Sequence, residues 1–208
     1  MVGSGDLPAD DANDLADAPV HRQVGALELI VRRNPVVSGI LERAPQLQLP
    51  SWYLGAGAVT QTVWNVLHGY DPTWGIKDYD LVYFDPDDLS ADAERVVERQ
   101  AGEMLADFGV DVDVTNEARV HLWYPQRFGR SIPPYRSTED AISTWPATAS
   151  SIGVRSGDDT FVVCAPFGLR DLFGMVVRPN KAMIDREIYE TKASRWAERW
   201  PRLTVLPW

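Results

Sequence analysis

Two short segments, Leu54–Val59 and Lys77–Val82, constrain the fold of this chain more than any other feature. The first leads from an apolar stretch through Gly55-Ala56-Gly57 into a helical pattern. The second carries Asp78-Tyr79-Asp80 at the start of a run of strand-forming residues. Alternate side chains of a strand leave the same face, so the two carboxylates point the same way, roughly 6–7 Å apart. Ionised groups this close repel each other unless a cation lies between them.

This pair predicts a magnesium site, because Mg²⁺ prefers carboxylate oxygens and keeps coordination positions for phosphate. The glycine turn has two interpretations. One is close packing between a strand and a helix. The other is that the backbone N–H groups of Gly55, Ala56 and Gly57 hold a polyphosphate at the helix N-terminus. The acidic strand downstream favours the second, and together the segments predict a metal-dependent phosphoryl-type transferase.

Length and composition exclude several classes of protein. The 208 residues are enough for one sizeable core. No apolar run approaches the roughly 20 residues that span a bilayer, and the N-terminus lacks a signal-peptide pattern. The single cysteine, Cys164, excludes an internal disulfide. A cytoplasmic protein without membrane association is therefore expected by default.

The net charge of −10 is unevenly distributed along the chain. Residues 1–18 contain five aspartates and no Lys or Arg, so they account for half of the net charge. We expect this segment to be a disordered acidic leader. The remainder has no broad basic surface of the kind that long nucleic acids select. A small-molecule or protein acceptor is therefore favoured over tRNA or DNA.

The hydrophobic pattern predicts alternating helices and strands in a single domain over residues 19–208, with residues 135–208 as a candidate C-terminal subdomain. Residues 125–134 are expected to form a loop. The expected helices cover residues 21–33, 35–41, 58–68, 90–108, 138–144, 168–173 and 182–200. The expected strands cover residues 52–54, 77–84 and 110–114, with a hairpin over 152–155 and 160–165.

The strand expected at Val110–Val114 places Asp111 and Asp113 on one face. One interpretation is an edge strand with a polar face. The other is that it lies beside the strand of Asp78 and Asp80 and adds a third carboxylate. Asp113 is the better candidate for that role, because polar residues follow it closely, whereas Asp111 is expected to be exposed.

The pattern of turn, helix and Asp-x-Asp strand resembles the nucleotidyltransferase superfamily with the DNA polymerase β-like fold, including a variant of the tRNA CCA-adding enzyme motif. Over about residues 20–202 the chain is similar to a bacterial nucleotidyltransferase-like family of that superfamily. The resemblance rests on Trp64–Gly69, Asp78–Asp85, Asn116–His121, Tyr135–Thr138, Ala165–Leu169 and Arg199–Pro201. The turn departs from the usual Gly-Gly or Gly-Ser, and the gap from Gly57 to Asp78 is longer than usual.

The resemblance implies an α+β fold, with a mixed twisted sheet flanked by helices. It also implies transfer of an NMP group from an NTP to a hydroxyl acceptor, with release of pyrophosphate. Two Mg²⁺ ions, with Mn²⁺ as a substitute, would be held by Asp78, Asp80 and Asp113. Asn116 would orient the sugar and Arg119 would neutralise phosphate charge. For these last two, a turn cap and a salt bridge are equally good interpretations.

Three rival functions differ in class. A degenerate nucleotidyltransferase would bind nucleotide or a protein partner without turnover, which the presence of all three carboxylates disfavours. A haloacid-dehalogenase-type phosphatase also uses Asp-x-Asp, but its first aspartate directly follows an apolar strand, whereas Gly75-Ile76-Lys77 precedes this pair. A metal-dependent glycosyltransferase would leave the glycine turn and its helix unexplained.

Overall fold

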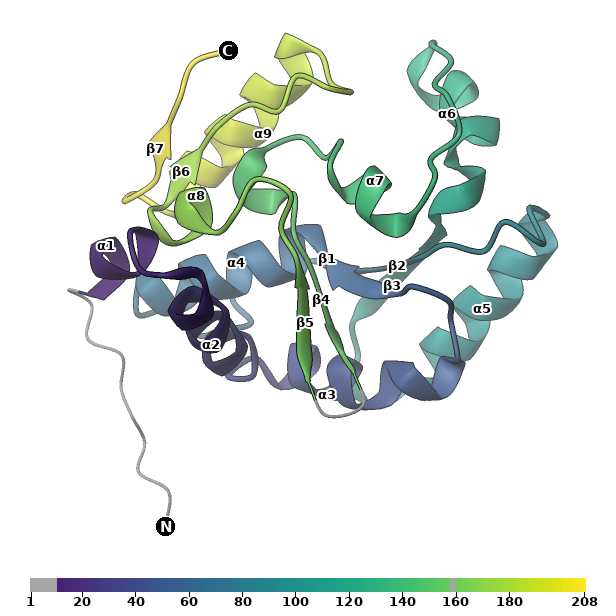
Figure 1. Cartoon of the computed structure of the whole chain (residues 1–208), viewed down its shortest axis with the longest axis horizontal. Helices are drawn as coiled ribbons and strands as arrows, with labels where there is room; N and C mark the ends of the chain where they lie inside the picture. The colour runs from purple at the N-terminus through teal and green to yellow at the C-terminus, as the bar shows by residue number, and fades with distance from the viewer. Residues whose placement is uncertain (1–10, 158–159) are drawn as a thin grey trace.

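The computed structural model describes residues 11–157 and 160–208, which form a five-stranded mixed sheet flanked by helices (Figure 1). The strand order is β3-β2-β1-β4-β5. Within this sheet only β2 and β3 pair in parallel, and the other neighbours are antiparallel. The strands are β1 (Tyr53–Gly55), β2 (Asp78–Tyr83), β3 (Asp111–Asn116), β4 (Gly153–Ser156) and β5 (Phe161–Cys164). This is the expected α+β architecture. Strand β3 lies beside β2, as in the interpretation that adds Asp113 to Asp78 and Asp80.

The helices divide between the two faces of the sheet. In Figure 1, α6 and α9 rise on one side with α7 between them, and α3 lies on the other side. The face opposite the carboxylates carries Leu54, Tyr79 and Leu81, which belong to the main apolar core. The helices are α1 (Asp11–Ala16), α2 (Val20–Val31), α3 (Pro35–Arg43), α4 (Ala56–Leu67), α5 (Ala91–Met104), α6 (Val120–Phe128), α7 (Thr138–Ile142), α8 (Arg170–Phe173) and α9 (Arg186–Arg199).

Helix α9 is anchored by tryptophans in the core. Trp196 meets Trp64 of α4 edge-on, with ring centroids 5.3 Å apart. Trp200, just past the helix, donates its indole N–H to Asn65 Oδ1 at 2.8 Å. Burying these rings supplies much of the apolar area that holds α9 against α4. Trp196 and Trp200 therefore belong to the core.

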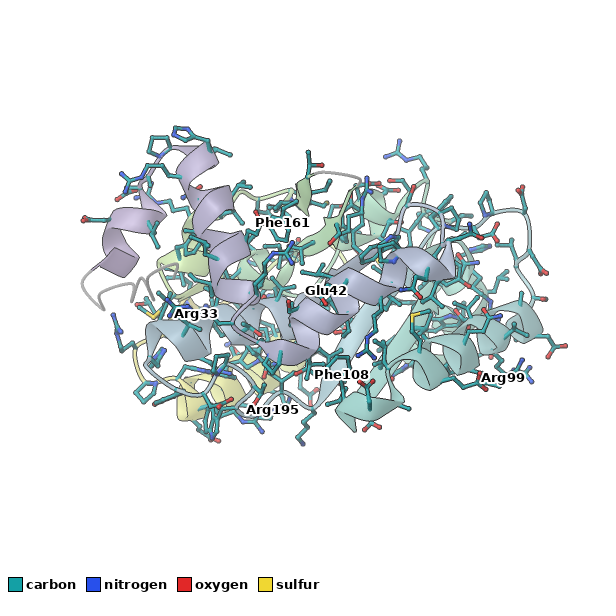
Figure 2. All side chains as sticks on the ribbon, turned by 90° about the horizontal axis from the view of Figure 1, so that it is seen from below. Arg33, Glu42, Arg99, Phe108, Phe161 and Arg195 are labelled. Carbon is teal, nitrogen blue, oxygen red and sulfur yellow. The ribbon has the colours of Figure 1, made fainter. Side chains whose placement is uncertain are left out.

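Short 3₁₀ turns complete the connections between these elements. The 3₁₀ turns are Ala44–Leu47, Ala106–Phe108, Glu117–Arg119 and Thr148–Ser150. Figure 2 shows α3 from below, with Glu42 on the helix and Phe108 beside it. A Cβ at Gly39 would lie 2.0 Å from the tip of the Phe108 ring, so only glycine allows this contact. The α3 helix is thereby fixed against the segment that leads into β3.

The structure corrects two expectations. Residues 125–134 were expected to be a loop, but α6 continues through Pro125 to Phe128, where the rings of Tyr124 and Phe128 pack 4.5 Å apart. The acidic leader was expected to be disordered to residue 18. Instead α1 is a helix with Leu15 buried, and the Gln23 amide donates to the Leu15 carbonyl at 2.9 Å. Residues 1–10 lie outside the described residues.

Other elements agree with the pattern or add to it. Ser90 caps α5 and Ser137 caps α7, each accepting a backbone N–H with its hydroxyl oxygen. A second, two-stranded sheet of β6 (Val176–Val177) and β7 (Thr204–Val205) was not expected. No helix of residues 11–157 and 160–208 is long and apolar enough to cross a membrane. The division at residue 135 stays a prediction.

Candidate functional site

The carboxylates gather where β2 and β3 run side by side. Asp80 is paired with Asp113, and Asp78 with Asp111, in parallel register. Paired residues of neighbouring strands point to the same face, and the strands lie about 4.8 Å apart. Four carboxylates therefore share one face, of which Asp78, Asp111 and Asp113 are exposed and Asp80 is half-buried.

The charges of this face are poorly compensated. Burial raises the pKa of Asp80 to about 6, and the charges of Asp78 and Asp113 add to the rise, whereas Lys192 opposes it. The backbone of Gly57 also faces this carboxylate and lowers its pKa slightly. Such crowding disfavours ionisation until a cation is present. The site is therefore electrostatically prepared for a positively charged ligand.

Lys192 on α9 is the cationic side chain whose charge acts on the Asp80 carboxylate. It is half-buried in the same cavity as Asp78 and Asp80. Burial lowers the pKa of Lys192, and the two aspartates partly offset that shift. Sequence reasoning missed this residue. The sequence pattern that could have indicated Lys192 is its helical spacing. It lies three residues after Tyr189 and four before Trp196, on the buried side of the helix.

The two glycines of the turn have different surroundings: Gly55 is tightly packed, whereas Gly57 has only one side-chain neighbour close by. A Cβ at Gly55 would lie 2.6 Å from the Trp145 ring and 2.9 Å from the Ile152 carbonyl oxygen. Ala56 has a φ of 48°, which is uncommon for a residue with a side chain, and its N–H donates to that same carbonyl at 3.0 Å. At Gly57 the nearest obstacle is the flexible Gln61 amide. Ala56 and Gly57 line the cavity, whereas Gly55 fixes the turn against β4.

The main cavity has a volume of about 420 Å³. Asp78, Asp80 and the glycine turn form one part of its wall. Helices α6 and α9, with the segment before α7, supply aromatic and aliphatic side chains. The lining also includes Glu117, Trp123, Tyr124, Tyr135, Trp145, Lys192 and Trp196. A cavity of this size, with an apolar wall and convergent polar groups, suits a nucleotide-sized ligand.

A second, more open depression lies on the far side of Asp78. It is lined by charged residues that include Lys77, Asp111 and Asp113. Asp78 borders both the main cavity and this depression. The two hollows thus meet at Asp78, and Asp113 belongs to the polar one.

Asn116 and Arg119 are engaged in structural contacts and do not line the main cavity. The Asn116 side chain accepts from Asp85 N at 3.0 Å and from Ala118 N at 3.1 Å, and so fixes the exit from β2. Arg119 forms a mostly buried salt bridge with Glu94 of α5 and donates to the Leu89 carbonyl at 3.2 Å. These contacts match the turn-cap and salt-bridge interpretations.

Glu117, which lies between these two residues, does line the cavity. Only 5% of it is exposed. Burial raises the pKa of Glu117 to about 8, and the charges of Asp80 and Glu94 contribute. Sequence reasoning missed this residue too, because an acidic residue directly after a strand is usually exposed.

The carboxylates are suitable ligands for Mg²⁺, but the described side chains do not enclose an ion by themselves. Asp78, Asp80 and Asp113 offer the oxygen ligands that Mg²⁺ prefers. Within the described residues, no three or more His, Cys, Asp or Glu side chains form a group that would hold an ion by themselves. Protein sites for Mg²⁺ commonly supply one or two carboxylates, and substrate phosphates and water complete the shell. The arrangement fits an ion that arrives with a phosphate ligand.

Comparisons with known proteins agree with this geometry. The model of a family described as nucleotidyltransferase matches residues 42–205, which include β2, β3 and α9. A solved NMR structure, described as revealing a CCA-adding enzyme head domain, is similar with a TM-score of 0.72 and 26% sequence identity. That similarity covers 95% of this chain and 100% of the other chain. No protein with a curated description matches the chain.

The family match covers well over half of the chain and contains the whole carboxylate site. The likeness to the head domain extends over nearly all of the rest. This chain therefore belongs to the nucleotidyltransferase family.

Proposed function

We propose that the chain is a metal-dependent enzyme that transfers an NMP group from an NTP to a hydroxyl acceptor and releases pyrophosphate. The family supports nucleotidyl transfer in general, and the specific reaction is our proposal. The observation that carries it is the parallel register that sets Asp80 opposite Asp113, with Asp78 on the same face. Divalent metals generally serve nucleotidyltransferases, and magnesium is the ion we propose.

Asp78 and Asp80 would hold the metal together with the triphosphate, and Asp113 would complete the site toward the acceptor. When bound, the ion neutralises phosphate charge and makes the α-phosphorus more susceptible to attack. Ala56 and Gly57 line the cavity, and the Gly57 N–H would donate to a phosphate oxygen, whereas the Ala56 N–H is already bound to the Ile152 carbonyl. Lys192 would neutralise charge that develops on the departing pyrophosphate.

The two hollows suggest how the substrates are divided. The NTP would occupy the aromatic-walled main cavity, and the acceptor would enter from the polar depression that contains Asp113. The acceptor oxygen forms a bond to the α-phosphorus as the bond to the bridging oxygen of pyrophosphate breaks. Asp113 accepts the proton of the acceptor hydroxyl and passes it to solvent, because its side chain is exposed.

The test is transfer of label from each α-³²P-labelled NTP in the presence of Mg²⁺. A small-molecule extract and a protein extract serve as two acceptor sources. We expect label transfer and pyrophosphate release with at least one NTP, and loss of both in Asp78→Asn/Asp80→Asn. Asp87→Asn is the matched control, because Asp87 is an exposed loop carboxylate outside both hollows.

The rival is a nucleotidyltransferase fold that binds without turnover. Nucleotide binding with no label transfer from any NTP into either extract would favour the rival. Equal label transfer by the wild type and the double variant would contradict the assignment of the carboxylates.

A further inference from the structure

Glu117 stands out among the cavity residues because it is buried and has no partner. Its carboxyl group has no hydrogen bond or ion pair among the residues that the structure describes. The nearby Arg119 is already paired with Glu94. The fully enclosed side-chain atoms without a partner in the described residues are His121 Nδ1 and Arg155 Nε, so the Glu117 oxygens stay open to the cavity, where a ligand can supply the missing contact.

The position of Glu117 keeps it at the cavity wall. It is the first residue of the 3₁₀ turn Glu117–Arg119 that follows β3. The Asn116 side chain and the Arg119 salt bridge fix this turn on both sides. The carboxyl group is therefore held in place before any ligand binds, as recognition residues need to be.

The surroundings of Glu117 favour a neutral carboxylic acid. The acidic groups that affect it are Asp80 on β2 and Glu94 on α5, and the Tyr135 hydroxyl is close enough for Glu117 to affect it. Lys192 on α9 lines the same cavity, where it is coupled to Asp80 and Asp78. A neutral acid presents one hydrogen-bond donor beside one acceptor. Its complement is a planar edge that carries an acceptor beside a donor.

The remaining wall suits a flat ring. Trp123 and Tyr124 from α6, Trp145 after α7 and Trp196 from α9 line the cavity. Aromatic side chains bind bases by stacking with little dependence on base identity. Stacking alone holds a ring without reading its edge, whereas Glu117 supplies a buried polar group on the same wall that can read it.

We propose that Glu117 recognises the nucleobase of the donor nucleotide by pairing, as a donor–acceptor group, with the hydrogen-bonding edge of the base. This inference rests on the proposed function, because it assumes that the donor NTP occupies the main cavity. It assigns to Glu117 the contact that distinguishes one base from another, which stacking on the aromatic wall does not supply.

The experiment compares binding of inorganic tripolyphosphate with binding of the α,β-methylene analogues of all four NTPs, which cannot be turned over. Isothermal titration in Mg²⁺ is carried out on wild type, Glu117→Gln and Glu117→Leu. Glu103→Gln on α5 is the control, because Glu103 is exposed and outside both hollows. Thermal melting establishes that each variant is folded.

We expect wild type to bind at least one of the four nucleotide analogues about tenfold or more tightly than the others, the factor given by one good neutral hydrogen bond in a buried site. Glu117→Leu should remove that preference. Glu117→Gln should keep it, because an amide also presents a donor beside an acceptor. Unchanged preference in Glu117→Leu would overturn the inference.

Two further outcomes separate this inference from the proposed function. Equal affinity of wild type for all four analogues would refute the role of Glu117 and leave nucleotidyl transfer standing. If Glu117→Gln lost the preference as fully as Glu117→Leu, the inference would also be overturned. The group that contacts the base would then be an ionised carboxylate and not a donor–acceptor pair. Failure of every phosphate compound to bind would refute the proposed function itself.

Discussion

Asp80 on β2 lies directly opposite Asp113 on β3 in a parallel ladder, and both carboxylates leave the face away from the main core. A one-residue slip of β3 would turn Asp113 into the core and bring Val114 out. Apolar burial of Val114 against the core therefore also fixes the position of a polar residue. The packing of the sheet and the assembly of the site depend on the same register.

Substitution of these two aspartates should separate binding from turnover. Asp80→Asn should reduce Mg²⁺-dependent nucleotide binding, because Asp80 lies in the main cavity. Asp113→Asn should leave binding nearly intact and reduce transfer by about 100-fold or more, because Asp113 lies on the acceptor side. Titration calorimetry and label transfer measure the two effects. Similar losses of binding in both variants would contradict the division of substrates between the hollows.

Lys192→Met should raise KM for the NTP and lower kcat/KM by about tenfold or more, since a cation facing phosphate oxygens is lost. The substitution keeps the length of the side chain and its apolar contacts in α9. Lys181→Met is a matched control, because Lys181 is exposed and contacts the ring of Trp208, outside the cavity. Steady-state kinetics with varied NTP checks the prediction, and equal kinetics in both variants would remove Lys192 from the site.

The sequence alone predicted the strands of the five-stranded sheet and the shared face of Asp78 and Asp80, because these depend on local periodicity. It did not predict Lys192 or Glu117. Helical periodicity places Lys192 on the stripe of Tyr189 and Trp196, but not opposite β2, because that depends on how Trp196 packs on Trp64 more than a hundred residues away. The burial of Glu117 likewise depends on α5 and the segment before α7.

The glycine turn offers a pair of substitutions with opposite consequences. Gly55→Ala should destabilise the fold by about 1–3 kcal/mol, because the new Cβ meets the Trp145 ring and a backbone carbonyl. Gly57→Ala should change stability little, since only the Gln61 amide must move. It should instead weaken nucleotide binding by adding a methyl group to the cavity wall. Urea unfolding and titration calorimetry distinguish the two. Equal destabilisation by both substitutions would contradict the assignment of the packing role to Gly55 alone.

The salt bridge between Arg119 and Glu94 should matter for stability. Arg119→Met leaves the mostly buried Glu94 without its cation and should cost about 3 kcal/mol. Glu94→Gln/Arg119→Met removes both charges and should recover part of that loss, because an uncompensated buried charge is no longer left behind. Chemical unfolding of the single and double variants measures the recovery. If Arg119 instead neutralises phosphate, nucleotide affinity will fall in both variants while stability stays near that of wild type.

The pH dependence of stability should reveal the state of Glu117. Its pKa is about 8 in the folded chain against 4.5 as the ordinary value, raised by burial and by Asp80 and Glu94. Between these values the folded chain holds a proton that the unfolded chain has lost, so this group makes the free energy of unfolding fall as pH rises. Glu117→Gln does not titrate and lacks that fall. In Mg²⁺-free buffer, the Tm of Glu117→Gln should therefore exceed that of wild type by a margin that widens from about pH 5 to about pH 8. A margin that stays constant over this range would show that Glu117 is ionised in the folded protein, and with it the donor–acceptor reading of the base would fail.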